Sequence, residues 1–200
     1  SEAPGADVVA VADLDPERLG ALHKRFTAVR TTTNYRELLD DPAIGAICVV
    51  TPISTHRALA EEAFAAGKHV FVEKPLAGTV ADAESIVEAA RRAGKVLMVG
   101  HTFVYNPAVT TVRGIIERGE LGKIQYVDSQ RVNLGLHQFD FNVLWDLGPH
   151  DVSIVLYWLG ESPEWVQCVG GCFVGWLLHA VTVARPEATA EPPGGQNALP

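Results

Sequence analysis

The feature that most constrains the fold is a regular alternation of short apolar runs with longer amphipathic segments in the first half of the chain. The apolar runs are rich in Val and Ile and have the length of buried strands; they cover residues 7–13, 44–50, 69–72 and 96–100. Segments suited to helices lie between them, at residues 16–26, 35–39, 55–66 and 80–93. This alternation predicts βαβ units and therefore an α/β fold, a doubly wound parallel sheet of Rossmann type.

Local signals fix several ends of these elements. Pro16 suits the first position of a helix, and Asp15 before it is a suitable N-cap. Gly67 and Gly94 follow the helices at 55–66 and 80–93, where glycine commonly ends a helix. Pro52 cannot continue the strand that precedes it.

The pattern changes near residues 101–106, which suggests a second, α+β domain. We expect helices at 107–118 and 144–159, and strands at 124–132 and 165–169.

The expected organisation has three parts. Residues 1–102 form a partial NAD-binding Rossmann domain, and residues 103–175 form part of an α+β substrate and oligomerisation domain. Residues 176–200 are rich in Ala, Pro and Gly and are expected to be a disordered or non-native tail. A truncated or frame-shifted gene and a natural flexible tail both account for that composition.

Charge and composition exclude several classes of function. The net charge of −8 argues against a general nucleic-acid binder, since phosphate contacts require an excess of Lys and Arg. No apolar run is long enough to span a bilayer, and no signal peptide is visible. The 3 cysteines fit a reducing cytoplasm. Cys168 and Cys172 are expected to be small apolar residues, and no metal site is expected.

Ligands of open α/β sheets bind outside the carboxyl ends of the strands, so residues that follow strands are site candidates. Asp13 stands where a dinucleotide fold binds the ribose hydroxyls, and its charge would repel a 2′-phosphate. It therefore favours NAD over NADP; a helix cap or a solvated turn acid is the alternative. Thr51, Pro52 and His56 also follow a strand and open a helix, a suitable place for an anion or a ribose.

Two further groups have the chemistry of proton transfer. Glu73 and Lys74 follow a strand, and Lys74 can stabilise an alkoxide there; a surface lysine is the alternative. Asp146 and His150 are four residues apart, so on a helix the acid can orient the imidazole. A core or capping histidine is the alternative for His150.

Together these motifs resemble a known family. The stretches TPISTH, AGKHVFVEKPLA, VGHTFVYNPAV and WDLGPHDVSIVLYWLG occur in the order and spacing of the Gfo/Idh/MocA oxidoreductases, and the resemblance covers about residues 7–175. The stretches GHTFVYNP and SQRVNLG look most like the branch that acts on nucleotide-linked sugars. The family's first strand and glycine-rich phosphate loop do not precede residue 7, and its later sheet strands do not follow residue 175.

The resemblance implies an NAD(P)-binding Rossmann domain, and a second domain whose open sheet forms a homo-oligomer. Lys74 resembles the family's lysine that contacts nicotinamide and substrate, His150 its catalytic acid/base, and Asp146 the supporting acid. The expected cofactor contacts are Asp13, Thr51, Pro52, His56, Glu73 and Lys74. The expected substrate contacts are Tyr105, Asn106, Arg131 and Asn133.

These observations predict an NAD-dependent enzyme that oxidises a hydroxyl of a sugar or nucleotide sugar. His150 would take the hydroxyl proton, Lys74 would stabilise the alkoxide, and hydride would pass to the nicotinamide. The alternative is a non-catalytic sensor or a defective remnant of the same fold. The pair Lys74 and His150 favours the enzyme, whereas the absence of the phosphate loop favours the remnant. No nucleic-acid or membrane partner is expected.

Overall fold

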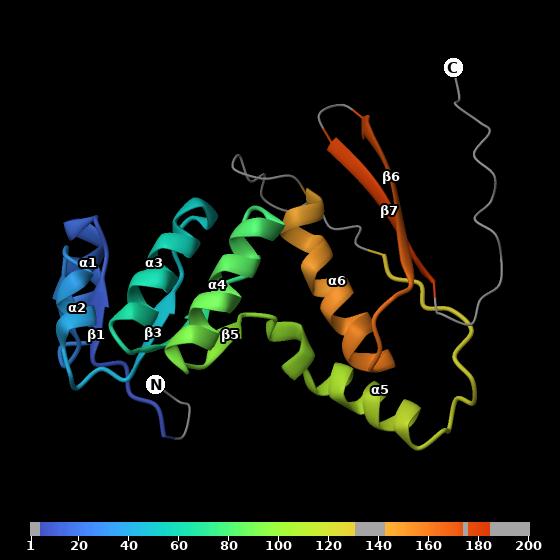
Figure 1. Ribbon diagram of the computed structural model, residues 1–200, viewed down its shortest axis with the longest axis horizontal. Helices are drawn as coiled ribbons and strands as arrows, with labels where there is room; N and C mark the ends of the chain where they lie inside the picture. The colour runs from blue at the N-terminus through green and yellow to red at the C-terminus, as the bar shows by residue number, and fades with distance from the viewer. Residues whose placement is uncertain (1–4, 131–142, 174–175, 185–200) are drawn as a thin grey trace. The chain divides into compact units, whose positions relative to one another are not determined.

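A computed structural model describes residues 5–130, 143–173 and 176–184 (Figure 1). Contacts divide the chain into two units, Ser1–Gly100 and His101–Pro200. Within the described residues, no helix is both long enough and apolar enough to cross a membrane.

The first unit alternates strands and helices as predicted. Its elements are β1 (Ala10–Ala12), α1 (Pro16–Arg25), β2 (Arg30–Thr32), α2 (Arg36–Asp40), β3 (Ala46–Val49), α3 (Ile53–Ala65), β4 (His69–Val72), α4 (Val80–Ala93) and β5 (Leu97–Val99). β1 pairs with β2, β4 lies between β3 and β5, and every pairing is parallel. The predicted parallel α/β fold is confirmed, although its strands form two separate ladders.

Side chains at the helix ends explain where the helices begin. Asp15 Oδ1 accepts from the backbone N of Glu17 at 2.8 Å and caps α1, as expected. Thr79 Oγ1 accepts from Asp82 N at 3.1 Å at the start of α4. α4 ends at Gly94, whose φ of 61° is a left-handed conformation that glycine adopts without steric cost.

The core of the first unit lies where α3 and α4 pack on one another and α3 packs on β3 and β4 (Figure 1). Alanines on α3 and α4 allow the two helices to approach closely, and larger apolar side chains fill the space between the helices and the sheet. Its buried members include Val49, Val70, Val72, Ala60, Ala63, Phe64, Ile86, Ala89 and Ala90.

Ile86 is fully buried in this core, with 0% of its surface exposed. Ile86→Ala should lower the free energy of unfolding by about 2–5 kcal/mol, because it removes buried methylenes and leaves a cavity. Val80→Ala on the same helix is the matched control, since Val80 is 69% exposed, and its effect should stay within about 0.5 kcal/mol. Urea unfolding of both variants measures the difference; equal losses would mean that α4 does not pack as described.

The second unit contains the 3-10 helix η1 (Thr102–Tyr105), α5 (Pro107–Glu117), α6 (Val143–Leu159), β6 (Trp165–Phe173) and β7 (Trp176–Ala184). α5 packs against α6 through polar contacts as well as apolar ones. Trp158 Nε1 donates to the carbonyl of Val109 at 2.9 Å, and Arg113 donates to the carbonyls of Tyr157 and Trp158. β6 and β7 form an antiparallel ribbon.

Two segments of this unit differ from the sequence prediction. The predicted strand at 124–132 is irregular over residues 124–130, because no neighbouring strand pairs with these residues; residues 131 and 132 lie outside the described residues. Part of the predicted tail is the strand β7, whose backbone pairs with β6 from Trp176 to Ala184. Pairing with a neighbouring strand outweighs the composition of the tail there. Residues 185–200 lie outside the described residues.

Candidate active site

The carboxyl ends of β3, β4 and β5 meet at one edge of their sheet. Glu73 N donates to the carbonyl of Val49 at 2.9 Å, and Gly100 N donates to the carbonyl of Val72 at 2.8 Å. The residues that follow the three parallel strands therefore lie side by side. This is the edge at which open α/β sheets bind ligands.

Glu73 and Lys74 occupy this edge directly after β4. Glu73 Oε2 accepts from the backbone N of Lys74 at 3.0 Å, and the Lys74–Pro75 peptide bond is cis. A Cβ on Gly100 would lie 3.0 Å from the Phe71 ring and 3.2 Å from the Glu73 carboxyl. Glycine at position 100 therefore leaves room for Glu73. Lys74 therefore follows β4 at the carboxyl edge of the sheet, and its predicted role stays a prediction.

The β3–α3 turn lies at the same edge and includes Thr51 and Pro52. Thr55 Oγ1 donates its hydrogen to the Pro52 carbonyl at 2.7 Å. The hydroxyl oxygens of Thr51 and Thr55 are 2.6 Å apart, and because the Thr55 hydrogen is already used, Thr51 is the donor in this contact. Pro52 is the N-cap of α3, and no side-chain hydrogen bond caps the helix. Thr55 N already donates to the Pro52 carbonyl at 2.9 Å, so the amides of Ile53 and Ser54 are the ones that can donate to an anion or a polar ligand.

His56 differs from its predicted role as a direct cofactor contact. The ring is only 2% exposed, and both nitrogens face backbone carbonyls. Nε2 lies 2.8 Å from the carbonyl oxygen of Thr51, and Nδ1 lies 3.1 Å from that of Pro75. The ring is thus engaged inside the protein, between the turn after β3 and the loop that follows Lys74.

Asp13 follows β1, as predicted. Its Oδ1 accepts from Asp15 N at 2.8 Å, its Oδ2 lies 3.8 Å from Arg18 Nη1, and its side chain is 36% exposed. Asp15, and not Asp13, caps α1, so the partly exposed carboxylate of Asp13 can accept further hydrogen bonds. The donor set of a ribose diol fits this acceptor.

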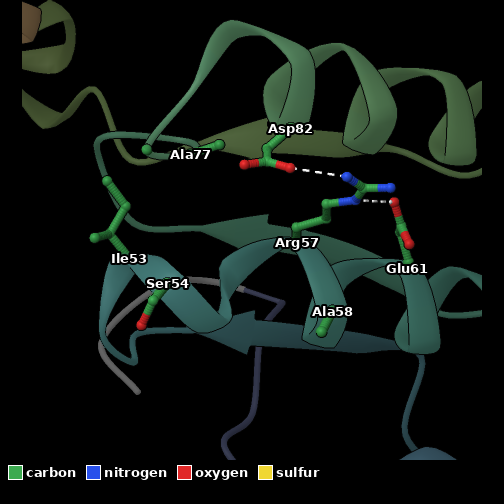
Figure 2. Close-up of a pocket in the computed structure, with 8 residues that line it drawn as sticks. Ile53, Ser54, Arg57, Ala58, Glu61, Ala77 and Asp82 are labelled. Atoms are coloured by element: carbon green, nitrogen blue, oxygen red, sulfur yellow. Dashed lines mark hydrogen bonds and ion pairs between the residues drawn. The ribbon is translucent and has the colours of Figure 1, made fainter.

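A groove runs along α3 and the start of α4 (Figure 2). Arg57 crosses it, with Nε 2.9 Å from Glu61 Oε1 and Nη1 2.8 Å from Asp82 Oδ1. The hydrogen bond from Arg57 holds the pKa of the Asp82 carboxyl below its usual value. The charges of the groove are thus paired with one another, and none of the predicted site residues lines it.

His150 and Asp146 both lie on α6, in the second unit. His150 is 8% exposed, and its ring meets the Phe103 ring edge-on at a centroid distance of 4.7 Å. The helix continues through Pro149, so the four-residue spacing places Asp146 and His150 on one face, as expected. The neighbouring Asp151 accepts from Ser129 Oγ at 2.8 Å.

Comparison with known proteins identifies the family. Residues 1–101 match the model of the Gfo/Idh/MocA oxidoreductase family, which describes an NAD-binding Rossmann fold. The chain belongs to this family. The predicted resemblance is confirmed, and with it the expectation of an NAD-binding fold.

Individual Gfo/Idh/MocA relatives cover most of the chain. It is 28% identical over 179 residues to the uncharacterized oxidoreductase YrbE of Bacillus subtilis, which covers 87% of the chain and 52% of the relative. It is 30% identical over 164 residues to the scyllo-inositol 2-dehydrogenase (NAD(+)) of the same organism. This match covers 80% of the chain and 48% of the relative. The chain thus spans about half the length of these relatives.

A solved structure shows the same fold. The crystal structure of an NAD binding oxidoreductase from Klebsiella pneumoniae superposes with a TM-score of 0.69 at 30% identity, and the match covers 82% of this chain and 47% of that one.

The predicted substrate contacts are only partly described. Tyr105 ends η1 and is 65% exposed, as a ligand contact requires. Asn106 Oδ1 accepts from Ala108 N at 2.9 Å and caps α5, so its carbonyl oxygen already has a structural role. Arg131 and Asn133 lie outside the described residues.

Two residues that contact predicted site residues were not among those singled out from the sequence, one in each unit. Phe103 packs on the His150 ring, and Gly100 makes room for Glu73. Gly100 directly follows a strand, and this position could have indicated it. Phe103 lies 47 positions before His150 in the sequence, and no periodic pattern links the two.

Proposed function

We propose that this protein is an NAD-dependent oxidoreductase that oxidises a hydroxyl group of a sugar, a polyol or a nucleotide sugar. The observation that carries the proposal is the position of Lys74 after β4, at the carboxyl edge of an NAD-binding family's sheet. The relative named scyllo-inositol 2-dehydrogenase (NAD(+)) supports a polyhydroxylated substrate. Tyr105 and the second unit supply the substrate contacts in this proposal.

In the proposed reaction His150 accepts the proton of the substrate hydroxyl. Its low exposure and its packing against Phe103 hold the ring in one orientation, and Asp146 on the same helix face supports it. Lys74 stabilises the negative charge that develops on the oxygen, since an ammonium group in a crevice is a strong electrostatic stabiliser.

Asp13, Thr51 and the first turn of α3 are the residues that would hold the cofactor. NAD, when bound, supplies the hydride acceptor of the reaction. The carboxylate of Asp13 accepts hydrogen bonds from the ribose hydroxyls and repels a 2′-phosphate, so the protein prefers NAD to NADP. In this proposal the amides at the start of α3 and the Glu73 carboxylate provide further polar groups at the carboxyl edge of the sheet.

The role of Asp13 can be tested by titrating NAD and NADP into two variants. Asp13→Ser should weaken NAD binding by about tenfold or more, because a hydrogen bond to a charged group contributes about 1.5–3 kcal/mol. NADP binding should change little or improve. Asp7→Ser is the matched control, since Asp7 is an exposed acid with no proposed role. Tighter binding of NADP than of NAD by the unsubstituted protein would refute the assignment.

The experiment that tests the function is reduction of NAD with a panel of candidate substrates. The panel contains inositols, free aldoses and UDP-linked sugars, and the absorbance of NADH reports turnover. Turnover with any member supports the proposal, and the preferred member identifies the substrate class. Binding of NAD without turnover of any member would instead support the alternative, a non-catalytic protein of the same fold.

A further inference from the structure

The turn after β3 and the loop after β4 both carry residues of the proposed site. The ladder between the two strands ends at the bond from Glu73 N to the carbonyl of Val49 at 2.9 Å. Beyond that bond, the turn at Thr51 and the loop at Lys74 and Pro75 leave the sheet. The orientation of Lys74 therefore depends on contacts other than the ladder.

His56 supplies such a contact. It lies in the first turns of α3, and its ring reaches both segments: Nε2 lies 2.8 Å from the Thr51 carbonyl oxygen, and Nδ1 lies 3.1 Å from that of Pro75 and 3.3 Å from that of Leu76. The ring is 2% exposed, so water cannot replace these bonds. Pro75 is itself buried and directly follows Lys74.

The chemistry of the three partners determines how His56 binds them. Backbone carbonyls only accept hydrogen bonds, so each contact is a hydrogen bond only when its ring nitrogen carries the proton; a neutral imidazole has one such N–H, and only the imidazolium form donates from both nitrogens. An apolar side chain of similar size would fill the space but leave buried carbonyls without a donor. Asparagine and glutamine each keep a donor, near the Nδ1 and the Nε2 positions respectively. The two contacts can therefore be separated by substitution.

We propose that His56 is a positioning residue that orients Lys74 by N–H donation from Nδ1 to the carbonyls of the Pro75–Leu76 segment. It acts through the loop and does not touch substrate or cofactor. The link to catalysis rests on the function proposed for Lys74, whereas the link to the conformation of the loop does not.

The test compares His56→Leu, His56→Asn and His56→Gln by the rate at which an amine-selective reagent acylates Lys74, followed by mass spectrometry. His56→Leu should change the rate at Lys74 by about tenfold, because the loop loses its donor. His56→Asn should stay within about threefold of the unsubstituted protein, whereas His56→Gln, which keeps only the donor toward Thr51, should resemble His56→Leu. Lys95, of similar exposure to Lys74, is the internal control and should not change.

If His56 only stabilised the fold and did not orient Lys74, the acylation rates would show a different pattern. The rates at Lys74 would then follow the melting temperatures of the variants and change at Lys95 as well, and this outcome would overturn the proposal. An unchanged rate at Lys74 in His56→Leu would also overturn it. Neither measurement requires turnover, so failure of the proposed function is detected separately, by the absence of NAD reduction in the unsubstituted protein.

Where the protein does reduce NAD, a double-mutant cycle adds a second test. His56→Leu should lower kcat by about 10–100-fold, the scale of a small misplacement of a reacting group. In the Lys74→Met background the same substitution should cost less than about threefold, because two residues that act through one group are not additive. Equal losses in both backgrounds would contradict action through Lys74.

Discussion

His150→Ala is expected to lower turnover of the preferred substrate by about 10²–10⁴-fold, the contribution typical of a positioned general base. Hydride cannot leave the substrate carbon productively unless the hydroxyl proton also leaves. A histidine 8% exposed and packed on Phe103 is a fixed acceptor for that proton. Single-turnover reduction of NAD measures the loss. NAD binding should be retained, since none of the proposed cofactor contacts is changed.

The control variants separate proton transfer from packing. His150→Asn keeps a polar side chain without a base and should lose activity as His150→Ala does. Asp146→Asn should cost less than His150→Ala, because Asp146 orients the ring and does not itself take the proton. His23→Ala changes an exposed histidine in the last turn of α1 and should be neutral. Near-normal rates in His150→Ala would move the acid/base role to Lys74 or to Asp151.

The elements best predicted from sequence are those whose first and last residues are marked by capping or helix-ending residues. The helix expected at 80–93 is observed at Val80–Ala93, because Thr79 caps its start and Gly94 ends it. β4 is observed at His69–Val72 as predicted. β2, at Arg30–Thr32, was not predicted, because its three residues are all polar and carry no apolar pattern; its parallel pairing with β1 forms it.

The segments where the prediction differed depend on whether a second segment pairs with them. The alternation at 124–132 is typical of a half-exposed strand, but a strand also needs a neighbour to pair with. β7 shows the converse, since Trp176–Ala184 pairs with β6 despite the composition of the residues that follow it. Hydrogen-bonded pairing is a property of two segments, and the pattern of one segment does not reveal it.

The candidate site was predictable where a residue type and a strand end coincide. Asp13, Thr51 and Lys74 all follow strands, as the apolar runs indicated. The position of His56 near the start of a helix was also predictable. Its contacts with the carbonyls of Thr51 and Pro75 were not, because only the folded chain brings these two segments to the ring. The edge-on contact of Phe103 with His150 likewise depends on how η1 packs on α6.

Lys74→Met should lower kcat by about 10²–10³-fold, the loss typical when one donor to a developing oxyanion is removed. Methionine keeps the length and much of the volume of the side chain, so the loop beside Pro75 should stay folded. Lys74→Arg keeps the charge but spreads it over a planar group that cannot occupy the same position, and it should recover only part of the rate.

Lys95→Met is the matched control for Lys74→Met, because it removes a lysine of similar exposure that follows α4 and not the β4 strand. It should leave turnover within about twofold, on the scale expected for a surface substitution. The effect of Lys74→Met should also fall on kcat more than on NAD binding, since the lysine stabilises charge that exists only during the reaction. Loss of NAD affinity with unchanged kcat would assign Lys74 to cofactor binding and leave the alkoxide without a stabilising cation.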